Sequence, residues 1–221
     1  MKTVPSTRLL LVAIMGLFIA ATASAVRAEV AFSTLKPDGT YFGGGGQFIT
    51  GSNAGFQSIG NAFSPSFTGT LTSIDIGISI TDATADGNIT LRLNPNDPST
   101  NRPNTSIDLL SGNLVTMTVI GTSNSDLVTL NYNGPALSLT AGQTYWLVLA
   151  PANAATSVIW NFNDAGIRGS ISSSNNGTSY SAPFTGDLSA FRINAVPEPS
   201  TYALCAGGAL LLGLLRRRRG A

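Results

Sequence analysis

The sequence contains no histidine, and its single cysteine, Cys205, lies in an apolar stretch near the C-terminus. The absence of histidine excludes Ser-His-Asp and Cys-His catalytic arrangements, and a zinc site would lose both of its usual ligand types. Without cysteine in the preceding chain there are no disulfides, so that part must be stabilised by packing alone. We therefore expect a protein that is not an enzyme. A glycosidase built on two aspartates is the least favoured alternative.

Positive charge is scarce between the two ends of the chain. Residues 29–195 contain five basic side chains against ten acidic ones, which gives a net charge of about −5. Nucleic-acid binding requires a dense positive surface, so we expect no nucleic-acid partner. The length of this segment fits one domain with a substantial core.

The N-terminal end has the pattern of a secretory signal peptide. Two basic residues precede an apolar run from Leu9 to Ala21, and small residues follow this run. A charged start, an apolar middle and a small-residue exit are typical of such peptides. Cleavage after Ala25 and cleavage after Ala28 both fit the pattern. We expect a signal peptide over residues 1–28, whereas an uncleaved membrane helix would need a longer run.

The C-terminal end combines a proline-rich motif, an uncharged apolar run over residues 200–215 and a basic end. The motif is Val196, Pro197, Glu198 and Pro199, and the basic end is Arg216, Arg217, Arg218 and Arg219. A transmembrane helix usually needs about 20 apolar residues. The shorter run predicts a span assisted by arginine snorkelling and local bilayer thinning. Because arginines stay on the cytoplasmic side, the chain before the span should face outward. The prolines predict a stiff extended hinge.

This tail resembles the PEP-CTERM sorting signal of exported bacterial proteins. The likeness rests on V-P-E-P-S-T from Val196 to Thr201, together with the apolar run and the arginines that follow. The resemblance implies that a membrane-embedded exosortase recognises Pro197, Glu198 and Pro199, after which the helix is removed and the ectodomain is released or transferred. The alternative is a permanent membrane anchor. We expect anchoring in the cytoplasmic membrane first and a cell-surface or extracellular location after processing.

Between the ends, the apolar residues alternate with a period of two. Ile74, Ile76, Ile78 and Ile80 predict a strand with one buried and one solvated face. Further strands are predicted at residues 89–93, 115–119, 127–132, 145–150, 158–162 and 191–193. Asp86-Gly87 predicts a tight hairpin between the first two strands. We expect an all-β fold over residues 29–195: an antiparallel β-sandwich, jelly-roll-like, with a single C-terminal transmembrane helix beyond it.

The segment from Phe63 to Ile193 resembles the choice-of-anchor R type of ectodomain. The likeness rests on L-T-S-I-D-I-G-I-S at residues 71–79, T-Y-W-L-V-L at 144–149 and V-I-W-N-F-N at 158–163. The resemblance implies an exported all-β domain without an assigned activity, and it supplies no catalytic residues.

Two stretches break the strand pattern. Gly43–Gly46 lacks the Lys-Ser or Lys-Thr of a phosphate-binding loop, so we expect a flexible loop there. The polar and proline-rich stretch Asn94–Asn104 predicts a long exposed loop.

Calcium is the one cofactor that the residue types allow. Asp82, Asp86 and Asn88 lie in one predicted turn, with Asp75 on the adjoining strand. Oxygen ligands in a flexible loop suit Ca²⁺, but the spacing is not that of an EF-hand, and an ordinary hairpin turn is the favoured interpretation. Asn96–Asp97 offers a weaker version of the same pattern.

Sugar binding by a β-sandwich would use exposed aromatic rings. Trp146 and Trp160 share faces with apolar residues, which predicts burial in the core. Tyr180 follows a polar stretch and is the candidate exposed ring. We expect an exported envelope or extracellular-matrix protein with a structural or adhesive ectodomain. The alternative is a carbohydrate-binding module for extracellular polysaccharide (exopolysaccharide).

Overall fold

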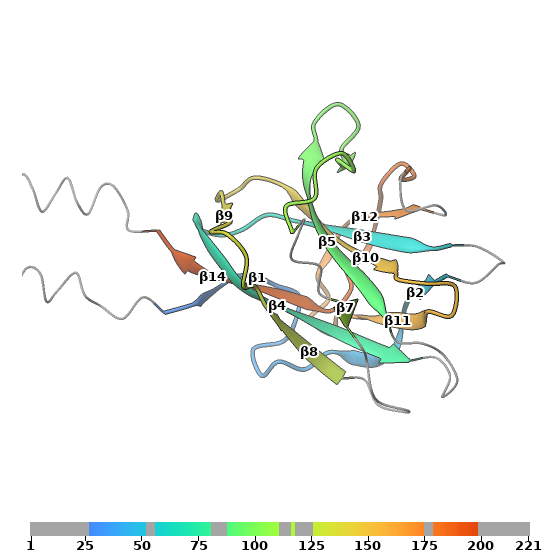
Figure 1. The fold of residues 1–221 in the computed structure, drawn as a ribbon. Helices are drawn as coiled ribbons and strands as arrows, with labels where there is room; N and C mark the ends of the chain where they lie inside the picture. Colours follow the sequence, from blue (N-terminus) through green and yellow to red (C-terminus); the bar gives the residue numbers. More distant parts are fainter. Residues whose placement is uncertain are drawn as a thin grey trace, which may run out of the picture.

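The computed structural model describes residues 27–51, 56–80, 88–110, 116–117, 126–174 and 179–198. These residues form two antiparallel sheets of seven strands each, packed face to face as a sandwich (Figure 1). None of the described residues is helical, and accordingly none forms a helix that could cross a membrane. The all-β class is confirmed, whereas the predicted helix at 200–215 and nearly all of the predicted signal peptide lie outside the described residues.

The first sheet is built around one long strand. Its members are β1 (Glu29–Ser33), β2 (Phe42–Thr50), β4 (Gly69–Ile80), β8 (Asp126–Asn131), β9 (Ser138–Leu139), β11 (Ser157–Phe162) and β14 (Phe191–Pro197). Their order is β1-β14-β4-β11-β2, and β8 and β9 also pair with β4. The strands predicted from the isoleucine alternation, from residues 127–132 and from residues 158–162 are all present in this sheet.

The second sheet contains the most buried strand of the domain. Its members are β3 (Ser58–Phe63), β5 (Ile89–Asp97), β6 (Arg102–Pro103), β7 (Thr116–Met117), β10 (Tyr145–Pro151), β12 (Arg168–Ser174) and β13 (Phe184–Asp187). Their order is β13-β12-β3-β10-β5-β6, and β7 pairs with β5. Every residue of β10 is buried, because β3 and β5 flank it and both of its faces are apolar. The strand predicted at residues 145–150 is confirmed.

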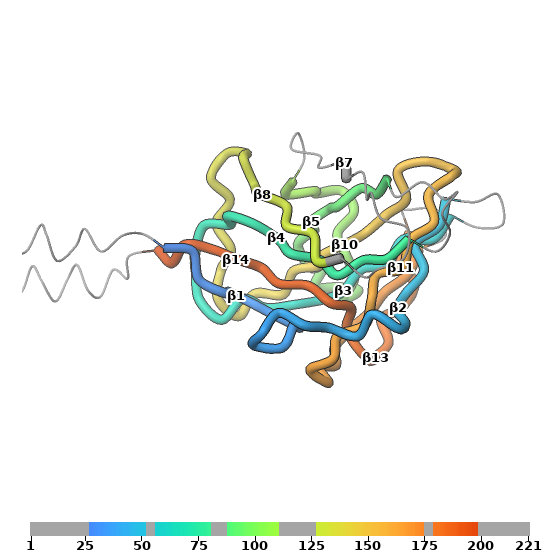
Figure 2. Tube along the Cα trace, turned by 90° about the horizontal axis from the view of Figure 1, so that it is seen from below, coloured from blue at the N-terminus to red at the C-terminus, as the bar shows by residue number. Residues whose placement is uncertain are grey.

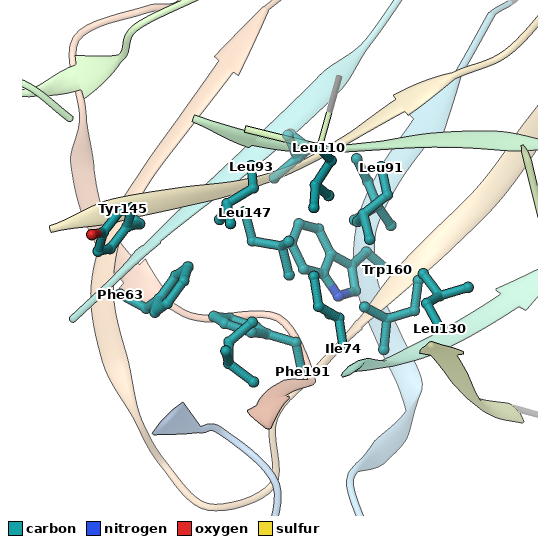
Figure 3. Packing of buried hydrophobic residues seen from close by; sticks show 14 of the residues in the cluster. Phe63, Ile74, Leu91, Leu93, Leu110, Leu130, Tyr145, Leu147, Trp160 and Phe191 are labelled. Atoms are coloured by element: carbon teal, nitrogen blue, oxygen red, sulfur yellow. The ribbon is translucent and has the colours of Figure 1, made fainter. Parts of the chain in front are cut away.

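Trp160 lies at the centre of the core between the sheets (Figure 3). Its ring nitrogen donates a 3.0 Å hydrogen bond to the carbonyl oxygen of Ala190, and its ring lies 5.8 Å from that of Phe191. The ring therefore fills the core and its one polar group has a partner. Trp146 is also fully buried, so the predicted burial of both tryptophans is confirmed.

The predicted hairpin between β4 and β5 is wrong, since these strands belong to different sheets. The end of β4 pairs with β11, with Ile78 opposite Trp160, whereas Leu91 of β5 lies opposite Leu149 of β10. The Asp86-Gly87 turn itself lies outside the described residues. In a sandwich, strands that follow one another along the chain can cross between sheets, so a turn signal does not identify the pairing partner.

Both stretches predicted as loops contain strands. Gly43–Gly46 lies inside β2, where a Cβ placed on Gly46 would come within 2.2 Å of the carbonyl oxygen of Trp160. Glycine at this position lets β2 approach β11 closely. In the second stretch β5 continues to Asp97 and pairs with β6, and Asn94 is buried.

The first and last strands of the described domain lie side by side. β1 pairs with β14 so that Glu29 lies opposite Ala195 (Figure 2). The strand that follows the predicted signal peptide and the strand that precedes the tail therefore leave the domain at the same end.

Truncation of Leu147, a fully buried residue of β10, tests the importance of packing in a domain without disulfides. We expect Leu147→Ala to lower the free energy of unfolding by about 2–5 kcal/mol, because it removes apolar contacts and leaves a cavity. Leu127→Ala, at a residue that is 37% exposed, is the control and should cost about 0.5 kcal/mol or less. Urea denaturation of both variants measures the difference. Equal costs would contradict the assignment of the core.

Candidate functional site

The beginning of the proline-rich motif belongs to the last strand of the domain. In β14, Val196 lies opposite Thr70 and Pro197 lies opposite Gly69 of β4. The contact is close, because a Cβ placed on Gly69 would lie 2.6 Å from the carbonyl oxygen of Val196. Proline is compatible with a strand terminus, where its missing N–H breaks no internal ladder bond. The predicted boundary after Ala195 thus falls inside β14.

Glu198 continues this attachment beyond the end of β14. Its backbone N–H donates a 3.1 Å hydrogen bond to the carbonyl oxygen of Thr68, and its Oε1 accepts a 2.6 Å hydrogen bond from the hydroxyl of Ser138. Val196–Glu198 are therefore docked against β4 and β9 and do not form a free hinge. Pro199 and the predicted basic end, Arg216–Arg219, lie outside the described residues.

Comparison with known families identifies this segment. The family model for the PEP-CTERM protein-sorting motif matches residues 195–219. The chain carries a PEP-CTERM sorting signal. The signal implies export and sorting, with exosortase as the processing partner. No curated protein matches the chain. The resemblance of the ectodomain to the choice-of-anchor R type stays a prediction.

The structure describes only part of the predicted calcium cluster. Asp82 and Asp86 lie outside the described residues, and Asn88 precedes β5. The carbonyl oxygen of Asn88 accepts hydrogen bonds from the Thr156 hydroxyl, at 2.7 Å, and from the Ala152 backbone. Within the described ranges, no three or more acidic or cysteine side chains gather as a metal site. The calcium site stays a prediction.

Asp75 was predicted on the solvated face of β4, but it is buried and fully engaged. Its Oδ2 accepts hydrogen bonds from Arg192 Nε at 2.7 Å and Asn194 Nδ2 at 3.1 Å, and its Oδ1 accepts one from Thr129 at 2.6 Å. Burial alone would raise the pKa of Asp75. The hydrogen bonds from Thr129, Arg192 and Asn194 and the charge of Arg192 outweigh burial, so the pKa lies below its ordinary value. The carboxylate is therefore a cross-strand connector that links β4 to β8 and β14.

Asn96 and Asp97, the weaker metal candidates, also have internal partners. Asn96 Oδ1 accepts a 2.8 Å hydrogen bond from the indole N–H of Trp146. Asp97 accepts hydrogen bonds from Ser99 and from the Thr100 hydroxyl, and these bonds lower its pKa. Asp97 therefore stabilises the turn between β5 and β6, and Asn96 connects β5 to Trp146 of β10.

Tyr180, the predicted exposed ring, is only 5% exposed, so that expectation is wrong. It packs against Trp146 and Val148 of β10, and Arg102 donates a 2.9 Å hydrogen bond to its carbonyl oxygen. Burial raises the pKa of Tyr180 to about 12. The neighbouring serines and asparagines predicted exposure of the segment, but a small second core under β10 buries the ring.

An open groove at the edge of the sandwich was missed by the sequence analysis. It has a volume of about 360 Å³ and lies between β2, β12 and β13. Phe48 and Phe184 line it, and each is 54% exposed. The available signal was the alternation in β2, since burial of Ile49 turns Phe48 outward.

Replacing Asp75 with asparagine tests the cross-strand connector. We expect Asp75→Asn to lower the free energy of unfolding at pH 7 by about 1–3 kcal/mol, because Arg192 loses its counter-charge. The folded state lowers the pKa of Asp75 below 3.8, so its contribution is present above that pH and is lost as the pH falls through the folded-state pKa. Urea denaturation at pH 7 and pH 3 should show the difference between wild type and variant shrinking in acid. A constant difference would refute this account.

Removing the Ser138 hydroxyl tests whether docking restrains processing of the tail. Ser138→Ala should increase the undocked population of Val196–Glu198 about two- to fivefold, since one hydrogen bond contributes about 0.5–1 kcal/mol. Exosortase must contact the motif, so conversion of the full-length chain should accelerate by a similar factor in pulse-chase labelling. Ser106→Ala, at an exposed serine, is the matched control. Equal conversion rates for the two variants would show that docking does not limit processing.

Proposed function

We propose that this chain is an exported protein of the bacterial envelope or extracellular matrix whose ectodomain has a structural or adhesive role. The observation that carries the proposal is the direct continuity of the sorting motif with the sandwich. Because Val196–Glu198 are still paired with the domain, processing nearby would deliver a compact domain without a long tail.

The carboxylates support a structural role over hydrolysis. Each of the following aspartates already accepts hydrogen bonds or forms an ion pair within the domain: Asp38, Asp75, Asp97, Asp108, Asp164 and Asp187. A glycosidase needs two carboxylates facing a substrate cleft, one of them available as an acid. The engagement of these side chains, together with the lack of histidine, favours a domain that is not an enzyme.

The arrangement of the ends supports a domain that stands on the membrane before it is released. β1 begins and β14 ends at one end of the sandwich, and Figures 1 and 2 both show β2 toward the other end. While the tail anchors the chain, the end with β1 and β14 would face the bilayer. The edge that carries β2 would face the surroundings of the cell.

A carbohydrate-binding ectodomain is the second candidate. It is favoured by the groove between β2 and β13, where exposed aromatic rings lie next to amide side chains. This role is compatible with the first, since binding to a matrix polymer is one form of adhesion.

Mass spectrometry of the extracellular protein from exosortase-containing cells tests the proposal. We expect a mature chain without Arg216–Arg219, located at the surface or in the matrix fraction. A triple variant with Pro197→Ala, Glu198→Ala and Pro199→Ala should stay in the membrane fraction with its tail. An extracellular form that retains the arginines, or normal processing of the triple variant, would contradict the sorting route. Release of the processed chain into the medium without any matrix retention would contradict the adhesive role.

A further inference from the structure

The groove forms where the edge strands of the two sheets come together. β2 ends the first sheet and β13 ends the second, so neither has a further strand on its outer side among the described residues. Ile59 of β3 and Ile171 of β12 line the groove and are almost completely buried. Its volume of about 360 Å³ lies within the range of small-molecule and ligand pockets.

Phenylalanine side chains gather along this edge. Phe48 and Phe184 line the groove, and Phe42, which is 50% exposed, lies opposite Phe162, another residue of the lining. The ring of Phe42 lies over Gly44, where an added Cβ would come within 2.9 Å of it. Glycine therefore leaves room for the ring on the strand surface. Half of the large apolar residues that the described chain exposes are these phenylalanines, the set being Val30, Phe42, Phe48, Ile107, Leu127 and Phe184. Such clustering marks an interaction surface.

Polar groups next to these rings are available for a ligand. Gln47 and Gln57 line the groove and are partly buried, and within the described chain their side-chain amides make no hydrogen bond. Each amide can donate two hydrogen bonds and accept two. The carboxylate of Asp187 lies 3.2 Å from Arg168 Nε, so the rim carries a neutralised ion pair.

Ring faces and uncommitted amides together suit a sugar. The C–H groups on one face of a pyranose pack against the negative face of an aromatic ring, while its hydroxyls both donate and accept hydrogen bonds. The net charge of about −5 on residues 29–195 opposes an anionic polymer, and it equally opposes a second copy of the same domain. A neutral ligand meets no such repulsion.

We propose that the groove between β2 and β13 binds a neutral polysaccharide, with sugar rings packed on Phe48 and Phe184 and hydroxyls hydrogen-bonded to Gln47 and Gln57. The inference rests on the proposed adhesive role and names its ligand. Figures 1 and 2 show β2 away from the end where β14 finishes, so the groove is open to a matrix polymer while the tail is anchored.

Affinity electrophoresis of the full-length chain in detergent tests the site, with dextran, hydroxyethyl cellulose or a soluble β-glucan cast in the gel. We expect retardation by at least one of these neutral polymers, and the affinity should change little between low and high salt because no ion pair is formed. Phe48→Ala and Phe184→Ala should each weaken binding about tenfold or more, and Gln57→Ala should weaken it severalfold. Leu127→Ala removes an exposed apolar residue outside the groove and should bind like wild type.

Four results would overturn the site. The first is the absence of retardation by every neutral polymer, and the second is binding that Phe48→Ala and Phe184→Ala leave unchanged. The third is retardation only in a gel cast with alginate, an anionic polymer. The fourth is a dimer in sedimentation that Phe48→Ala dissociates. The last result would assign the face to a second copy. Because Phe48 and Phe184 are half exposed, their variants should keep the circular dichroism spectrum of the wild type. If any of these results occurred while the processed chain was still retained in the matrix, the proposed ligand of the groove would be wrong and the adhesive role would still be supported.

Discussion

The pairing of β14 with β4 holds the sandwich together and fixes the position of the first residues of the sorting signal. β14 inserts between β1 and β4 and contributes Phe191, Ile193 and Ala195 to the core. The same strand continues into the first residues of the PEP-CTERM motif. A change that weakens the end of this strand therefore acts on the attachment of the motif as well as on the packing of the domain. The end of the domain and the start of the motif therefore share one strand.

Different parts of the sandwich have different roles. Apolar packing between the sheets supplies the stability that disulfides cannot supply, and the Asp75–Arg192 pair ties β4 to β14 on the other face of the first sheet. The end of the sandwich with β1 and β14 presents the tail, and the distant edge with β2 and β13 presents aromatic rings. The proposed adhesive role is compatible with this separation, since the edge with the aromatic rings would stay accessible while the tail is in the membrane.

Local patterns in the sequence predicted seven of the fourteen strands in the described residues, and they predicted the pairing partners poorly. The isoleucine alternation identified β4 and continuous apolarity identified β10, because burial leaves a direct mark on the residues concerned. The separation of β4 and β5 into different sheets depends on contacts far apart in the chain, so Asp86-Gly87 could not reveal it. Tyr180 and Asp75 were misplaced for a related reason: what covers a side chain comes from other strands. The docking of Glu198 on Ser138 and the groove at Phe48 likewise arise only when distant segments meet.

Hydrogen–deuterium exchange at the backbone amide of Glu198 tests the central claim most directly. The full-length chain would be compared with an isolated peptide that covers the motif. If β14 holds the sorting signal against the sandwich, the N–H of Glu198, which donates to Thr68, should exchange at least about tenfold more slowly in the chain than in the peptide. Equal exchange rates in the chain and the peptide would show that the motif is a free linker and would contradict the account.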